Sequence, residues 1–183
     1  MDDTEIFKNF AEYLHVQHSL ESDTVKLIID HSKVVVIPKD SFLLGQGQIC
    51  KYVYFIFSGK AISFLTGLDG KASTWFFHFN GCNNFIQNVF AVDYKSFLSE
   101  DISAISIKTL STVVAIQLSK KDVNLMLSLS VAFDNWIRTM DEKIFILTKR
   151  RTLPISHVLK LLYRDLSRDS APVFEPDPKI NHA

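Results

Sequence analysis

The residue types that most often carry chemistry do not form a catalytic or metal-binding pattern in this sequence. Cys50 and Cys82 are the only cysteines, too few for a four-cysteine zinc or iron–sulfur site. No two histidines are four residues apart, the spacing of a helical metal pair. Serine, histidine and aspartate are all present, but no nucleophile-elbow string or phosphate-binding loop accompanies them. The sequence therefore predicts a protein that is not an enzyme, with no metal site and no cofactor.

The composition narrows the function further. Charges balance in the 183 residues, with 20 Lys and Arg against 20 Asp and Glu, which excludes a uniformly basic nucleic-acid coat but not a local basic patch. Hydrophobic residues make up 47%, enough for a sizeable core. The acidic N-terminus is unlike a signal peptide, and no apolar run is long enough to span a membrane. We expect a cytoplasmic protein with no membrane contact.

Two helices are predicted before a region of short strands. The first, over 5–15, has an apolar face made of Ile6, Phe7, Phe10 and Leu14. Ser22 is predicted to cap the second, over 23–31. From Lys33 to Leu118 the chain breaks into short runs rich in Val, Ile, Phe and Tyr. Such runs, separated by turn residues, predict a β-sandwich or barrel.

One hairpin is predicted within this β region. Asp69-Gly70 lies between the strand-like runs 60–66 and 72–79. Glycine tolerates the positive φ that a tight hairpin turn requires. The two runs are therefore expected to pair as antiparallel neighbours.

Helices are expected again after the strands. Ser119, with Asp122 three residues on, predicts an N-cap, followed by helices over 120–128 and 131–151. The second helix has an apolar stripe with heptad-like spacing, made of Phe133, Ile137, Met140, Ile144 and Leu147. We expect this stripe to join two copies in a homodimer. The alternative is an ordinary helix packed on the barrel.

Four strings, in order, resemble the Crp/Fnr family of bacterial transcription regulators, and more narrowly its divergent Bacteroidetes branch. They are PKDSFLLGQG at 38–47, YVYFIFSGK at 52–60, GKASTWFF at 70–77 and DYKSFL at 93–98. The resemblance implies a mainly β fold with helices: a double-stranded β-helix, or jelly-roll barrel, flanked by N-terminal helices. It also implies a long C-terminal dimerisation helix and a DNA-binding winged helix-turn-helix.

The resemblance divides the chain into three expected parts. A sensor barrel would span 1–128 and the dimerisation helix 129–152. Residues 153–183 would begin a C-terminal helical region that is incomplete, because Pro178 and the residues after it resemble only the opening of the helix-turn-helix. DNA contact would thus depend on an element at or beyond the C-terminus.

The sequence departs from the family where the family binds a cyclic nucleotide. Family members hold the nucleotide with a Gly-Glu pair and, further along, an Arg followed by Ser-Ala. Ser103 matches the end of this phosphate cassette, which places Ala91 and Val92 at the Gly-Glu pair and Ile102 at the Arg. An anionic phosphate needs a cation and N–H donors. We therefore predict that cAMP does not bind in the family's manner.

The barrel is then expected to hold another small ligand or none. The candidate ligand-binding residues are Asn88, Asp93, Tyr94 and Ser103. The alternative for Asn88 and its polar neighbours is a surface loop, since Asn is common in turns. The alternative for Asp93 and Tyr94 is that they cap and pack the short cassette helix.

Two functions follow from these observations. The first is the sensor and dimerisation part of a Crp/Fnr-type transcription regulator. The second is a free-standing ligand-binding or protein-interaction module without DNA binding, which the missing recognition helix and the zero net charge favour.

Overall fold

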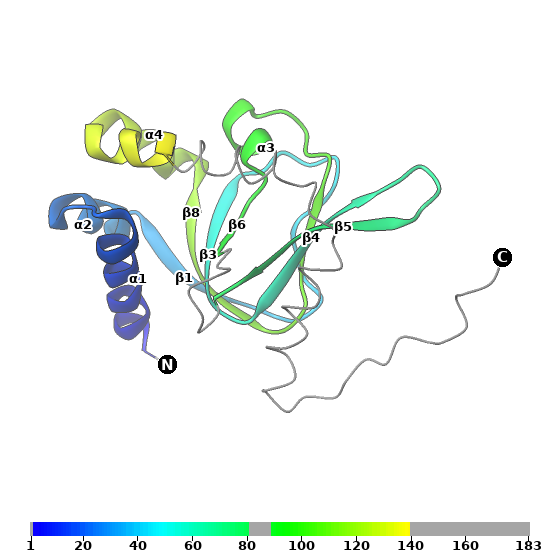
Figure 1. The fold of residues 1–183 in the computed structure, drawn as a ribbon, viewed down its shortest axis with the longest axis horizontal. Coiled ribbons are helices and arrows are strands. Elements are labelled where there is room, and N and C mark those ends of the chain that lie inside the picture. The colour runs from blue at the N-terminus through cyan, green and yellow to red at the C-terminus, as the bar shows by residue number, and fades with distance from the viewer. Residues whose placement is uncertain (1, 81–88, 140–183) are drawn as a thin grey trace. The chain divides into compact units, whose positions relative to one another are not determined.

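The computed structural model describes residues 2–80 and 89–139, and Figure 1 shows their helices and strands. In chain order these are α1 (Asp3–His18), α2 (Ser22–Asp30), β1 (Ser32–Ile37), β2 (Phe42–Leu44), β3 (Tyr52–Ser58), β4 (Lys60–Thr66), β5 (Ala72–Phe79), β6 (Phe90–Ala91), α3 (Tyr94–Ser99), β7 (Ser106–Thr109), β8 (Val113–Ser119) and α4 (Lys120–Leu129). Residues 131–139 are also helical.

The strands form two antiparallel sheets of four strands each. The first sheet has the order β1-β8-β3-β6 and the second the order β2-β7-β4-β5. Strands that are neighbours in a sheet are mostly distant in sequence, as β1 and β8 are, which is the pattern of a jelly roll. The predicted jelly-roll barrel with N-terminal helices is confirmed.

The hairpin prediction is also confirmed. β4 and β5 pair from Lys60 with Phe79 to Thr66 with Ala72, and this hairpin projects from the barrel in Figure 1. Gly70 has a φ of +77° at the turn, a conformation that side chains other than glycine rarely adopt. The Asp69 carboxylate accepts a hydrogen bond from the Lys71 N–H at 3.1 Å, which fixes the turn.

The two N-terminal helices agree with the sequence in extent but not in every cap. Ile6, Phe10 and Leu14 of α1 are buried as predicted, and Phe7 is half-buried. The prediction that Ser22 caps the second helix is wrong. The Val25 N–H already bonds to the Glu21 carbonyl, so the helix begins one residue earlier. Glu21 takes the cap position without a side-chain cap bond.

Aromatic rings join α1 to the first sheet and to the helix at 131–139. We call Phe10, Tyr13, Phe55, Phe90 and Trp136 the aromatic cluster. Ring centroids lie 4.6 Å apart for Phe10 and Phe55, 5.6 Å for Phe55 and Phe90, and 6.4 Å for Phe90 and Trp136. Burial in this cluster raises the pKa of Tyr13 to about 12. The face of the first sheet beside α1 is therefore covered by apolar packing.

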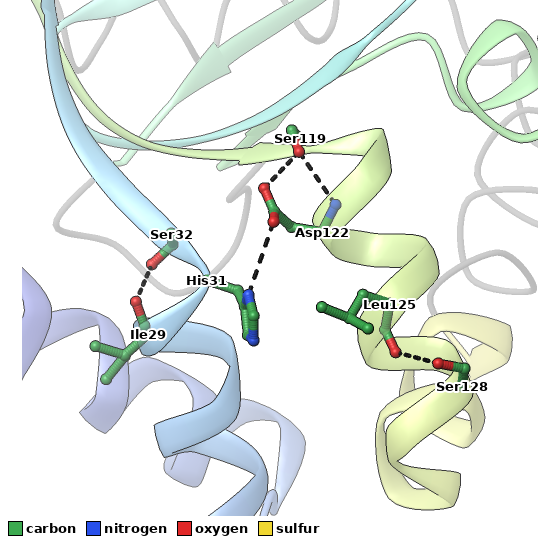
Figure 2. A network of polar contacts seen from close by, with 7 residues as sticks. All are labelled: Ile29, His31, Ser32, Ser119, Asp122, Leu125 and Ser128. Atoms are coloured by element: carbon green, nitrogen blue, oxygen red, sulfur yellow. Dashed lines mark hydrogen bonds and ion pairs between the residues drawn. The ribbon is translucent and has the colours of Figure 1, made fainter.

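The end of the β region leads directly into α4, as predicted. The Ser119 hydroxyl accepts a hydrogen bond from the Asp122 N–H at 3.1 Å and contacts the Asp122 carboxylate. The same carboxylate lies 3.7 Å from Nδ1 of His31, the C-cap residue of α2. Figure 2 shows this network, which connects the first turn of α4 to the end of α2.

The expected dimer stripe lies only partly within the described residues. Phe133 is fully buried in the single chain, with its ring 5.6 Å from that of Trp136, and Ile137 is half-buried. Met140, Ile144 and Leu147 lie outside the described residues. Dimerisation through this stripe stays a prediction, as does the division of the chain into three parts.

Candidate ligand-binding site

Asp93 caps the short helix α3. Its backbone is extended, and its carboxylate accepts a hydrogen bond from the Ser96 N–H at 3.4 Å. The Asp93 carbonyl accepts from the Phe97 N–H at 2.8 Å, and Tyr94 is the first residue of the helix. The sequence left open whether Asp93 would cap the helix or contact a ligand, and the capping role is confirmed.

Asp93 also bonds to a second candidate residue. The Ser103 hydroxyl donates to Oδ2 of Asp93 at 2.6 Å, although the two residues are ten positions apart. Ser103 is only 2% exposed, and its hydroxyl accepts from the Ile105 N–H at 3.1 Å. Two of the four candidate ligand contacts thus satisfy each other within the chain.

A third segment, the loop at 47–50, is bonded to both sides of this contact. The Ser103 carbonyl accepts from the Gly47 N–H, and the Ser103 N–H donates to the Gln48 carbonyl, both at 2.8 Å. The Ser96 hydroxyl accepts from the Cys50 N–H at 2.9 Å and donates to the Asp101 carbonyl at 2.6 Å. Burial raises the pKa of the Cys50 thiol, which keeps it in the protonated form.

The degenerate cassette positions carry apolar side chains in this arrangement. Ala91 and Val92 are buried, whereas Ile102 is 72% exposed and forms an isolated β-bridge with Ile49. None of the three side chains can neutralise a phosphate or accept a bond from a sugar hydroxyl. Arg138, the one arginine in the described ranges 2–80 and 89–139, pairs with Asp134 on its own helix at 3.0 Å.

The barrel holds a buried polar pair that the sequence reasoning missed. The Ser63 hydroxyl on β4 lies 2.5 Å from Nε2 of His78 on β5, and Nδ1 of His78 lies 2.8 Å from the Phe90 carbonyl on β6. A carbonyl can only accept, so Nδ1 carries the proton and Nε2 accepts from Ser63. Burial lowers the pKa of His78 to about 4, so the ring is neutral near pH 7.

The register of the two hairpin strands could have predicted this pair from the sequence. Side chains alternate along a strand, and His78 stands opposite Ala61 in the register. Ser63 lies on the same face as Ala61, two residues along. A prediction made from the hairpin register would have placed Ser63 and His78 together on the inner face.

The remaining predictions concern Asn88, metal ligands and membrane spans. Asn88 and its polar neighbours lie outside the described residues. Within the part of the chain that is described, no three potential ligand side chains gather to hold a metal ion. None of the described helices has the length and hydropathy needed to cross a bilayer.

Comparison with solved structures identifies the architecture. A cyclic nucleotide-binding domain from Methylobacillus flagellatus KT matches with a TM-score of 0.59 and 13% identity over 93% of this chain and 88% of that one. The chain has the fold of cyclic-nucleotide-binding domains. No protein-family model and no curated protein sequence matches it, so the likeness shows the fold alone.

Two similar structures carry this fold as part of a regulator. The Catabolite Activator Protein of Thermus thermophilus matches with a TM-score of 0.56 and 20% identity, over 80% of this chain. The N-terminal domain of a transcriptional regulator from Streptomyces coelicolor A3(2) matches with a TM-score of 0.55 and 13% identity, over 72% of this chain and 89% of that domain. The match spans only 62% of the Thermus protein.

Proposed function

We propose that this chain is the sensor and dimerisation part of a Crp/Fnr-type transcription regulator whose barrel does not bind cAMP in the family's manner. The cyclic-nucleotide-binding fold supports this proposal, and so does the likeness to the regulator domain from Streptomyces. The apolar side chains at the cassette positions Ala91, Val92 and Ile102 support the second part of the proposal, that cAMP does not bind in the family's manner. In this proposal the chain acts by binding and is not an enzyme, and any DNA contact is made by an element at or beyond its C-terminus.

The observation that carries the proposal is the cassette itself. Ile102 is apolar and exposed at the position where the family has its arginine. The nearby Asp93 carboxylate already accepts from Ser96 and Ser103. A carboxylate repels a phosphate, and the two donors that it engages are not available to a ligand.

Calorimetric titration with cAMP tests this proposal. We expect no binding heat at micromolar nucleotide, because the cassette positions Ala91, Val92 and Ile102 carry neither a cation nor a carboxylate. Saturable micromolar binding to the wild-type chain would contradict it. The Ile102→Arg variant is an informative companion, since it restores a cation at the degenerate position without changing a buried residue.

The free-standing binding module remains the second candidate, and the balanced charge favours it. A DNA-contacting protein usually presents a basic surface. A gel-shift assay on the full reading frame with genomic DNA fragments separates the two functions. A retarded, salt-sensitive complex supports the regulator, whereas no complex at low salt supports the module.

A further inference from the structure

The contact between Asp93 and Ser103 does more than end a helix. A helix cap needs only the bond from Asp93 to the Ser96 N–H, which is long at 3.4 Å. The bond to the Ser103 hydroxyl is shorter, at 2.6 Å, and reaches a residue outside α3. Both bonds have the same charged acceptor, so their lengths distinguish them: 2.6 Å is short for an O–H···O bond, whereas 3.4 Å is long for an N–H···O bond. The stronger of the two contacts is therefore the one that joins separate segments.

The Ser119 and Asp122 pair at α4 provides an internal comparison. It has the same two residue types, but they are three positions apart and belong to one helix start. The bonds between its two members stay within that helix start, and its link to another segment is the separate 3.7 Å contact of Asp122 with His31. The Asp93 and Ser103 pair closes a loop of the chain, and the segment at 47–50 is bonded to both of its sides through Ser96 and Ser103.

We propose that the Asp93 carboxylate is a built-in lock that holds α3 against the segment 101–105 and the loop 47–50. Each of the three segments bonds to the other two. The Asp101 carboxylate also accepts from the exposed Ser99 hydroxyl of α3 at 2.9 Å, but Asp93 is the carboxylate that bonds to the buried Ser103. Breaking the lock leaves the Ser103 hydroxyl bonded only to the backbone of Ile105, in its own segment, and loosens α3. The proposal concerns the order of the cassette region and stands whether or not the chain acts on DNA.

Amide hydrogen exchange tests the lock, because the segments contain backbone donors that report on it. These donors are the N–H groups of Phe97 in α3 and of its C-cap Glu100, and of Cys50 and Ser103 around the helix. In Ser103→Ala we expect their exchange to be at least tenfold faster than in the wild type. Exchange within α1 should not change, since α1 packs on the aromatic cluster.

Three further variants separate locking from capping and from loss of a hydroxyl alone. Asp93→Ser keeps a good N-cap but is too short to reach Ser103, so it should behave like Ser103→Ala. Asp93→Asn keeps a hydrogen-bonding side chain of the same length, so its exchange rates should lie between those of Asp93→Ser and those of the wild type. Ser128→Ala removes an exposed hydroxyl that bonds to the Leu125 carbonyl of its own helix, α4, and should exchange like the wild type.

The double variant completes the test. If Asp93 and Ser103 act through each other, combining Asp93→Ser with Ser103→Ala adds little to either single change. Wild-type exchange rates in Asp93→Ser, or fully additive effects in the double variant, would overturn the lock. Neither result depends on cAMP titration, so a failure of the lock is distinguishable from a failure of the proposed function.

Discussion

The aromatic cluster and the cassette contacts hold neighbouring parts of the barrel by different physics. In the cluster, rings from α1, the first sheet and the helix at 131–139 pack at centroid distances of 4.6 to 6.4 Å. Around α3, the carboxylates of Asp93 and Asp101 and the hydroxyls of three serines connect three short segments. The two regions are adjacent in the sequence: Phe90 of β6 lies in the cluster, and Asp93 follows it by three residues.

The difference lies in how each region responds to change. Burying an apolar side chain contributes roughly 1.5–3 kcal/mol and involves no group that titrates. A hydrogen bond contributes about 1 kcal/mol net and is lost when one partner changes. The cluster is therefore expected to set global stability, while the cassette contacts set the local order of α3.

The largest expected effect comes from removing a ring of the cluster. Phe10 is fully buried and packs on Phe55, so Phe10→Ala should lower the free energy of unfolding by about 3–5 kcal/mol. Urea denaturation followed by circular dichroism measures the change. If the alanine variant does not fold, Phe10→Leu keeps much of the volume and should show a smaller loss in the same direction.

Val16→Ala is the matched control for this prediction. Val16 lies on the same helix but is 68% exposed, so its truncation should change the free energy of unfolding by less than about 0.5 kcal/mol. Equal losses in Phe10→Ala and Val16→Ala would show that the cluster has no special role and that α1 is simply a fragile helix.

Local patterns predicted most of the fold. The apolar face of α1, the Asp69-Gly70 turn and the Ser119 cap all depend on residues within a few positions of one another. Such features can be predicted from the sequence because the physics that causes them is local. The wrong cap at Ser22 shows the limit, since a shift of one residue in the start of α2 was enough to move the cap to Glu21.

The site was harder to predict because its contacts cross the chain. Asp93 and Ser103 were both candidates, but the bond between them depends on the turn of α3 and on the loop at 47–50. Ser63 and His78 come together only through the register of β4 and β5. A sequence pattern can identify polar residues, but it does not say whether they will bind a ligand or one another.

The next effect in size depends on pH and comes from His78. The pKa of His78 is about 4 in the folded chain and near 6.5 in the unfolded chain. Between these values the unfolded state binds more protons, so the free energy of unfolding falls as the pH drops from about 6.5 towards 4. The contribution lost is about 3 kcal/mol. Urea midpoints measured across this range test the prediction.

His78→Asn is the matched variant for the pH dependence. Its amide N–H can replace Nδ1 in the bond to the Phe90 carbonyl, but the side chain does not titrate. The variant should be less stable than the wild type at pH 7 because Ser63 loses its partner. Its stability should change less with pH between 6.5 and 4. An unchanged slope would mean that other groups cause the acid sensitivity.

The smallest of these effects tests a single polar contact without any ring or buried charge. Ser119→Ala removes the hydroxyl that accepts from the Asp122 N–H, and loss of such a cap costs about 1 kcal/mol.

Ser22→Ala is the control, because Ser22 lies inside α2 and Glu21 holds its cap position. Alanine is also a slightly better helix former than serine, so Ser22→Ala should leave the unfolding midpoint unchanged or raise it slightly. Equal losses from the two changes would mean that Ser22 does cap α2 in solution and that the sequence-based prediction was right. A loss confined to Ser119→Ala, several times smaller than that of Phe10→Ala, would establish the ranking of ring packing above single polar contacts.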